Sequence, residues 1–185
     1  MATGIVETSN GGLFENEIEL NGKYATMVRF LKEQVGLFNT YREAYVIATI
    51  VGYLECRGET KDTSDKVQPA SIFAADLKPR MLDLKFMYRT LMLVEDIPGG
   101  TIEDYMNRAF RYDSDSAYRD KLRENMKKFH SYTCGGLEFL YGKFKDLNRL
   151  DDVVNTLYDY IHEFANSVGI LDDEDELPDF TPTFD

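Results

Sequence analysis

Apolar residues recur every three or four positions along most of this sequence, which is the spacing of one face of an α-helix. The second of the predicted helices, counted along the chain, begins at Thr40 and runs to about Cys56. Its apolar stretch, residues 44–54, is about half of the ~20 residues that cross a bilayer, so we expect a buried core helix. The first predicted helix lies between residues 21 and 36, and its apolar face consists of Tyr24, Met27, Val28, Phe30, Leu31 and Val35.

Two patterns predict where helices begin. Thr40 and Glu43 have the spacing of a capping box, in which a hydroxyl and a carboxylate each accept a hydrogen bond from a backbone N–H of the first turn. Thr101 with Asp104 gives a weaker form of this signal. Gly52 lies inside the second helix, where glycine costs about 1 kcal/mol relative to alanine. We therefore expect another helix to approach closely at Gly52.

A second core helix is expected after a polar loop that covers residues 57–68. A short helical turn is predicted over residues 69–73, and the core helix follows from Asp76 or Lys78 to Val94. Pro79 fits only near a helix start, because its ring breaks an interior hydrogen bond. The apolar members of this helix are Met81, Leu82, Leu84, Met87, Leu91, Met92 and Val94.

The last third of the chain predicts three more helices. The first is capped by residues 114–116 and is expected to end at Gly135-Gly136, and a short aromatic helix follows. The last long helix carries apolar residues from Leu150 onward and ends by Gly169. The predicted fold is all-α, an irregular bundle of about six or seven helices.

The first 20 residues leave two structures open. Residues 10–12 are a turn signal that predicts a short β-hairpin, whereas a lone two-stranded ribbon is marginal unless it packs on something. The alternative is a flexible start with a docked segment near residues 18–20. The expected organisation is an N-terminal arm or hairpin (1–20), a helical domain (21–170) and an acidic tail (171–185).

Charge is concentrated in the tail. The chain has 185 residues, a size typical of one domain, and a net charge of −12, of which residues 171–185 contribute −7. This field repels phosphate, which disfavours binding to nucleic acid or an anionic membrane. The tail is interpreted either as a solvated segment or as a partner-binding segment. The candidate partner-binding residues are Asp172, Asp173, Glu174, Asp175, Glu176, Phe180 and Phe184.

A row of basic residues, the basic stripe, is predicted on the helix after Ser114. Arg119, Arg123 and Lys127 recur every four residues, and His130 continues the row. Such a stripe is the candidate for nucleic-acid contact. The alternative is a solvated face with intrahelical ion pairs, namely Asp115 with Arg119, Asp120 with Arg123 and Glu124 with Lys128.

No motif in the sequence predicts a catalytic, metal or cofactor site. His130 and His162 fall on different predicted helices, and Cys134 with His130 lacks an orienting third group. The glycine pairs have neither the spacing nor the lysine of a phosphate-binding loop. Two distant cysteines and the absence of a signal-peptide pattern predict a soluble, cytoplasmic protein.

Two stretches carry a resemblance to a known family. Residues 37–44, leading into Ala48, Gly52 and Arg57 and followed by residues 71–73, resemble the pattern of small helical proteins associated with bacterial DNA phosphorothioation and related anti-phage defence systems. Residues 132–138 are similar to the closing motif of that family. The resemblance implies a role beside DNA-modifying or DNA-cleaving machinery and carries over no catalytic residue.

Three functions are therefore considered. The leading hypothesis is a non-enzymatic accessory or adaptor of a bacterial defence or DNA-processing system that acts through protein–protein contacts. The first alternative is a helical DNA-binding regulator that uses Arg119, Arg123 and Lys127. The second is an enzyme whose site is assembled from carboxylates distant in the sequence.

Overall fold

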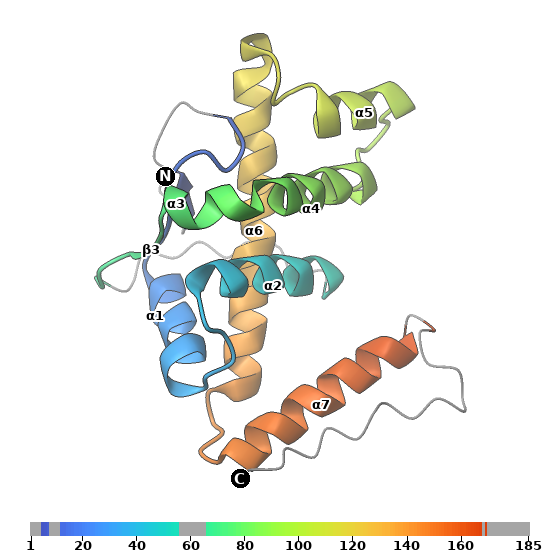
Figure 1. Cartoon of the computed structure of the whole chain (residues 1–185). Helices are drawn as coiled ribbons and strands as arrows, with labels where there is room; N and C mark the ends of the chain where they lie inside the picture. Colours follow the sequence, from blue (N-terminus) through green and yellow to red (C-terminus); the bar gives the residue numbers. More distant parts are fainter. Residues whose placement is uncertain (1–4, 8–11, 56–65, 168, 170–185) are drawn as a thin grey trace. The chain divides into compact units, whose positions relative to one another are not determined.

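A computed structural model describes residues 5–7, 12–55, 66–167 and 169, and it confirms a mainly α-helical protein with a small antiparallel sheet (Figure 1). The chain separates into two compact units, Met1–Gly142 and Lys143–Asp185. In the described residues, no helix has the length and apolar character that a membrane span requires.

The sheet has three strands, and its middle strand β2 (Ile18–Leu20) pairs with both others. β1 (Ile5–Glu7) lies antiparallel to β2, so the predicted N-terminal strand pairing is confirmed. β3 (Ala70–Ile72) pairs with the other edge of β2, with Ile18 opposite Ile72. The helical turn predicted over residues 69–73 is therefore wrong. Ala70 and Ile72 are buried on alternate positions, as a strand with one packed face requires.

The first helix follows its predicted face. α1 (Lys23–Arg29) continues as a π-helical turn, Phe30–Gln34, and the chain leaves it at Gly36, whose φ of 71° suits glycine. Tyr24, Val28 and Leu31 are fully buried, as their spacing predicted.

The start of α2 (Tyr41–Leu54) shows half of its predicted capping box. The Thr40 hydroxyl accepts a hydrogen bond from the Glu43 backbone N–H at 3.1 Å. Glu43 Oε2 accepts from the backbone N–H of Asn39, at 2.9 Å, instead of from Thr40. The carboxylate thus caps the same helix end one residue earlier than expected.

The second core helix is reached through two short turns. α3 (Ala74–Leu77) and a 3-10 turn (Lys78–Arg80), which holds Pro79, precede α4 (Met81–Val94). The buried face of α4 consists of Leu84, Tyr88, Leu91 and Met92. The predicted core members Leu82 and Val94 are instead 83% and 54% exposed, because the helical period turns them away from this face.

α5 (Ile102–Phe110) begins with a complete capping box, in which Thr101 accepts from the Asp104 N–H and Asp104 accepts from the Thr101 N–H. A 3-10 turn (Ser116–Tyr118) then leads into α6 (Arg119–Phe144), whose first turns carry an apolar row of Leu122, Met126 and Phe129. Met126 and Phe129 of that row are buried.

α6 is one continuous helix of 26 residues, so the break predicted at Gly135-Gly136 is wrong. A Cβ placed on Gly136 would overlap with the backbone carbonyl of Ala48, and a Cβ on Gly52 would overlap with the carbonyl of Tyr132. The predicted close approach at Gly52 is therefore confirmed. These glycines are in α6 and α2 because the two backbones touch there, and the loss of helix propensity is offset by packing.

Polar side chains accompany this crossing of α2 and α6, and all of them are paired. Thr49 Oγ1 donates to the Tyr45 carbonyl at 2.7 Å and lies 2.7 Å from Thr133 Oγ1. His130 Nε2 lies 3.0 Å from the Tyr45 hydroxyl. Burial lowers the pKa of His130 to about 4, so the imidazole is neutral at pH 7.

The second unit contains the end of α6 and the whole of α7 (Leu150–Ser167). α7 confirms the last predicted helix. Asp151 and Asp152 lie in its first turn, where carboxylates interact favourably with the helix dipole. The Asn166 amide lies 2.9 Å from His162 Nδ1.

Candidate protein-binding groove

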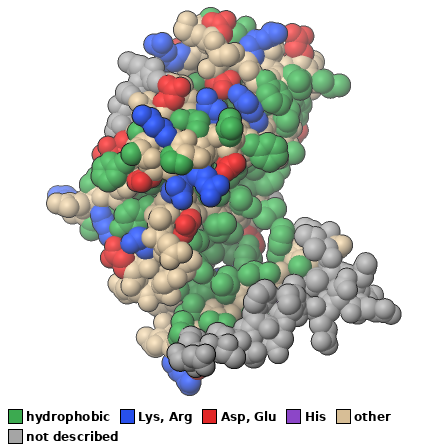
Figure 2. All heavy atoms as spheres, viewed as in Figure 1, with side chains coloured by type: hydrophobic (Ala, Val, Ile, Leu, Met, Phe, Trp, Pro, Cys, Tyr) green, Lys and Arg blue, Asp and Glu red, His purple; other side chains and the backbone are tan. Residues whose placement is uncertain are grey.

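An apolar groove of about 730 Å³ lies between α2 and α4, which both run across α6 (Figure 1). Figure 2 shows hydrophobic side chains gathered along one side of the first unit, over α2, α4 and α5. The α2 helix lines the groove with Arg42, Glu43, Val46, Ile47, Ile50, Tyr53 and Leu54. The other wall consists of Arg80, Asp83, Leu84, Phe86, Met87, Thr90, Leu91 and Val94.

The α2 wall exists because this helix is apolar on two faces. One face, with Ala44 and Ala48, packs against the core. The other face contains Ile47, Ile50 and Leu54, which are 42%, 39% and 43% exposed. Their spacing of three and four residues places them in one row along the helix. The expectation that residues 44–54 form a buried core helix is therefore confirmed for the first face and wrong for this row.

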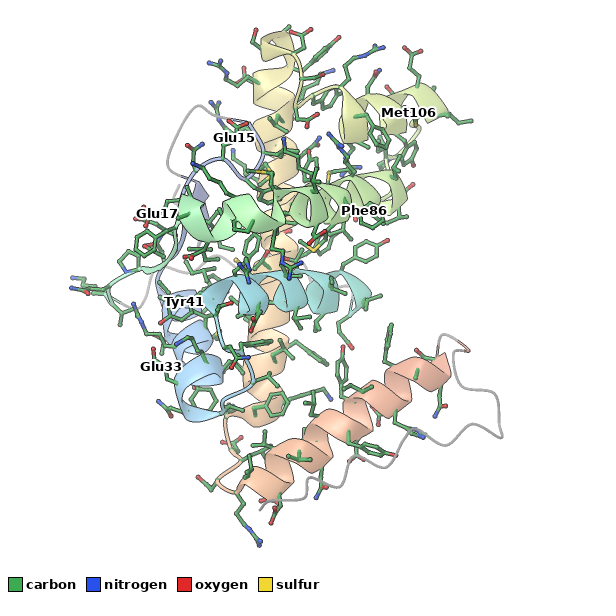
Figure 3. The ribbon with its side chains drawn as sticks, in the orientation of Figure 1. Glu15, Glu17, Glu33, Tyr41, Phe86 and Met106 are labelled. Atoms are coloured by element: carbon green, nitrogen blue, oxygen red, sulfur yellow. The ribbon has the colours of Figure 1, made fainter. Side chains whose placement is uncertain are left out.

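The α4 wall combines a buried floor with an exposed rim. Leu84 and Leu91 are nearly buried, whereas Phe86 is 73% exposed and projects from α4 on the groove side (Figure 3). Large apolar side chains that stay exposed in one patch mark a surface for ligands or partners.

One end of the groove is held in place by contacts with α6. The Tyr53 ring packs edge-to-face on Tyr132, with 5.4 Å between centroids. The Tyr132 hydroxyl donates to Glu95, the residue after α4, and Lys128 Nζ lies 2.9 Å from the other oxygen of that carboxylate. Burial first, and the hydrogen bond to Glu95 second, raise the pKa of Tyr132 above its usual range. Both walls are thus fixed to α6, and the groove is preformed.

The other end of the groove is polar. Arg42 donates from Nη1 to the Asp76 carbonyl at 2.9 Å. Arg80 forms an exposed ion pair with Asp83, with 3.4 Å between Nη1 and Oδ2. The groove therefore has one apolar end and one charged end.

Of the predicted site residues, those of the acidic tail fall outside the described part of the chain. Asp172, Asp173, Glu174, Asp175, Glu176, Phe180 and Phe184 all belong to residues 170–185, which the structure does not describe.

Three members of the basic stripe, Arg119, Arg123 and Lys127, are exposed on α6. His130 is buried and does not extend the stripe. Arg123 pairs with Asp120 at 2.9 Å, as the solvated-face interpretation expected. Lys128 pairs with Glu95 of the α4 end instead of Glu124. The use of the stripe for nucleic-acid contact stays a prediction.

Carboxylates from distant parts of the sequence meet in a smaller pocket of about 340 Å³, where Asp96, Asp104 and Glu124 lie with Arg108 and Lys121. Asp104 serves the α5 cap, and its hydrogen bonds with the Thr101 backbone and hydroxyl lower its pKa. A general acid needs a raised pKa, so this carboxylate suits a structural role.

The described residues contain no group of three or more His, Cys, Asp and Glu side chains that could hold a metal ion. Cys134 is buried in α6, as expected for a packed small residue.

Comparisons with known proteins found no matching family model, curated protein or solved structure. The functional argument therefore rests on the groove. Sequence reasoning missed this surface, although one signal was present: residues 44–54 are apolar almost throughout, so α2 has more apolar residues than a single core-facing row needs.

Proposed function

We propose that this protein is a non-enzymatic adaptor that binds an apolar helix of a partner protein in the groove between α2 and α4. The observation that carries the proposal is the row of exposed apolar side chains along both walls, above all Ile47, Ile50 and Phe86. A row of exposed apolar side chains on α2 that faces Phe86 and Val94 of α4 forms the kind of surface that receives the apolar face of a third helix.

The groove offers a favourable free energy of binding because it is apolar and preformed. Each square ångström of apolar surface removed from water contributes roughly 25 cal/mol. Walls that are already fixed by the α2–α6 crossing and the Tyr132–Glu95 contact lose little conformational entropy when a ligand binds. An occupied groove would cover Ile50 and Met87, which lie on opposite walls.

The cellular system in which the adaptor works is proposed from the sequence resemblance alone. A partner is to be sought among the proteins of DNA-modification or defence machinery, with which the resembling proteins are associated. The groove supports a protein partner independently of that setting, because its chemistry is apolar and its charged rim is small.

Site-specific photo-crosslinking in the native cell tests the proposal. A photoreactive residue is placed at position 50, inside the groove, and in a separate variant at position 82. Leu82 is the matched control because it lies on α4, is 83% exposed and does not line the groove. We expect a discrete adduct from position 50 that position 82 does not give. Identical adducts at both positions, or none at position 50, would reject the proposal.

A further inference from the structure

The smaller, polar pocket of the first unit is separate from the groove, because the two share no lining residue. The segment after α4, helix α5 and helix α6 form its walls. Its charged lining residues are Asp96, Asp104, Arg108, Lys121 and Glu124. Within the described part of the chain, none of these five side chains belongs to an ion pair. Charges of both signs therefore line one pocket without neutralising one another.

The two cations of the pocket are held by uncharged groups. Arg108 donates from Nη1 to the Glu95 carbonyl at 3.1 Å, which uses one of the five N–H groups of its guanidinium. Lys121 Nζ lies 5.2 Å from the centre of the Tyr112 ring and 5.7 Å from that of Tyr118. Both side chains are thus fixed in place while their charge remains available to an anion.

Two of the three carboxylates are anchored in the same way. Asp104 Oδ2 accepts from the Thr101 backbone N–H at 2.8 Å and from the Thr101 hydroxyl at 2.7 Å. Asp96 Oδ1 accepts from the Tyr105 hydroxyl at 3.3 Å. The carboxylate of Glu124 has no hydrogen bond or ion pair with the described residues. Glu124 is therefore the lining residue best able to bind a ligand cation.

Polar atoms without a partner lie next to the pocket. The buried side-chain atoms that lack a hydrogen-bond partner in the described residues include the Tyr88 hydroxyl, Arg89 Nε, Asp113 Oδ1 and Asn125 Nδ2. Tyr88 is fully buried, and this burial raises its pKa to about 12, whereas the adjacent Asn125 amide and the charge of Arg108 act to lower it. Asn125 and Arg108 also line the pocket, so the Tyr88 hydroxyl lies close to its wall. Buried polar atoms of this kind mark a place for a bound water or ligand group.

We propose that this pocket binds a small zwitterion, a molecule with a carboxylate and an ammonium group such as a free amino acid. The carboxylate binds Arg108, and the ammonium group binds Glu124. A ligand with one charge would leave the opposite charges of the pocket unpaired, so a molecule that carries both is favoured. The volume of about 340 Å³ lies in the lower part of the range of ligand pockets, roughly 300–1,000 Å³. This site adds a small-molecule ligand to the protein and does not depend on the proposed adaptor function.

A titration of the full-length protein at pH 7, followed by the NMR signals of its backbone amides, tests the proposal. The probes are glycine, β-alanine and 4-aminobutyrate, which separate the two charges by increasing distances. Each is compared with the carboxylic acid and the amine of similar length, for example butyrate and butylamine for 4-aminobutyrate. We expect at least one amino acid to bind about fivefold more tightly than both analogues, the ratio that ~1 kcal/mol from one exposed charge pair gives. Its signal changes should include residues of α5 and residues 121–125.

Three variants assign the two ends of the ligand. Glu124→Gln should make the amino acid bind no better than the matched carboxylic acid, and Arg108→Gln should make it bind no better than the matched amine. Arg123→Gln is the control, because Arg123 lies on α6 outside the pocket and is exposed. The control should keep the wild-type preference. Glu124 has an exposed side chain, so its variant stays informative if circular dichroism shows that Arg108→Gln has lost the fold along with its bond to Glu95.

Three results would overturn the proposal. The first is that none of the amino acids changes the signals of the pocket residues. The second is that the single-charge analogues bind as tightly as the amino acids. The third is that Arg123→Gln loses the preference as Glu124→Gln does, because the overall charge of the protein would then be the cause. Signal changes confined to groove residues such as Ile50 count as the first result.

Discussion

The two apolar faces of α2 differ in how completely the rest of the protein covers them. The face that meets α6 is packed backbone to backbone at Gly52 and Gly136, and the hydroxyl of Thr49 is paired there. The opposite face exposes Ile47 and Ile50 in an open groove. One helix therefore presents similar apolar chemistry to two different environments, a filled crossing and an unfilled groove.

The difference separates stability from recognition. The crossing has no spare volume, so any added atom there must displace backbone. The groove has spare volume and exposed apolar side chains, so substitutions there change the surface and little else. Four measurements test this contrast, and they are described from the largest expected effect on stability to the smallest.

Gly52→Val should have the largest effect. The new side chain would overlap with the Tyr132 carbonyl and force α2 away from α6, which we expect to lower the free energy of unfolding by about 3 kcal/mol or more. Urea denaturation measures the loss. Gly142→Ala is the matched control, because nothing lies within 4 Å of a Cβ at that position of α6. The control should be neutral or gain up to about 1 kcal/mol. An equal loss in both variants would contradict the close crossing.

The pH dependence of stability should reveal the buried His130. Its pKa is about 4 in the folded protein and about 6.5 when unfolded, so only the unfolded chain takes up the proton between these values. Acidification therefore favours unfolding, and the contribution is lost as the pH falls from about 6.5 towards 4.

From pH 7 to pH 5 we expect protonation of His130 in the unfolded chain to lower the free energy of unfolding by about 2 kcal/mol. The measurement is urea denaturation at both pH values for the wild type and for His130→Gln, whose amide does not titrate. Other groups titrate in both proteins, so the difference between them isolates the histidine. The same pH dependence in both would show that His130 is not buried as a neutral group.

The paired hydroxyls of Thr49 and Thr133 should have a smaller effect. Replacing either residue by valine removes one hydrogen-bond partner from the other, buried hydroxyl. We expect this to lower the free energy of unfolding by about 1–2 kcal/mol. The double variant should lose less than the sum of the single variants, because both partners are then removed together. Strict additivity in a double-mutant cycle would mean that the two side chains do not interact.

Ile50→Glu should have the smallest effect on stability. Its side chain faces the groove and is 39% exposed, so we expect the free energy of unfolding to change by about 0.5 kcal/mol or less. Thermal or urea denaturation beside Leu82→Glu measures this directly. A loss as large as that of the threonine variants would place Ile50 in the core and remove the contrast between the two faces.

The sequence predicted the positions of helices and caps better than how these elements pack against one another. The helical periods, the caps at Thr40 and Thr101 and the close approach at Gly52 depend on local spacing, and the structure confirms them. Gly135-Gly136 misled because a glycine pair signals a break by propensity, while packing against Ala48 keeps the helix continuous. β3 was missed because three residues form a strand only when β2 offers a free edge.

The groove was out of reach for a related reason. Periodicity shows that Ile47 and Ile50 lie together on a helix, but it does not show which apolar row the rest of the chain covers. That outcome depends on where α4 lies relative to α2, which is a tertiary property. The candidate residues found from charge, such as Arg123, were visible in the sequence because charge patterns are local.

The most direct test of the central claim is the affinity of the partner identified by crosslinking, measured by calorimetry against three proteins: the wild type, Ile50→Glu and Leu82→Glu. If a helix binds in the groove, Ile50→Glu should weaken binding at least about tenfold, equivalent to about 1.4 kcal/mol. Leu82→Glu, which is equally charged and lies on the same unit outside the groove, should bind like the wild type. Equal affinity of all three proteins would contradict the account.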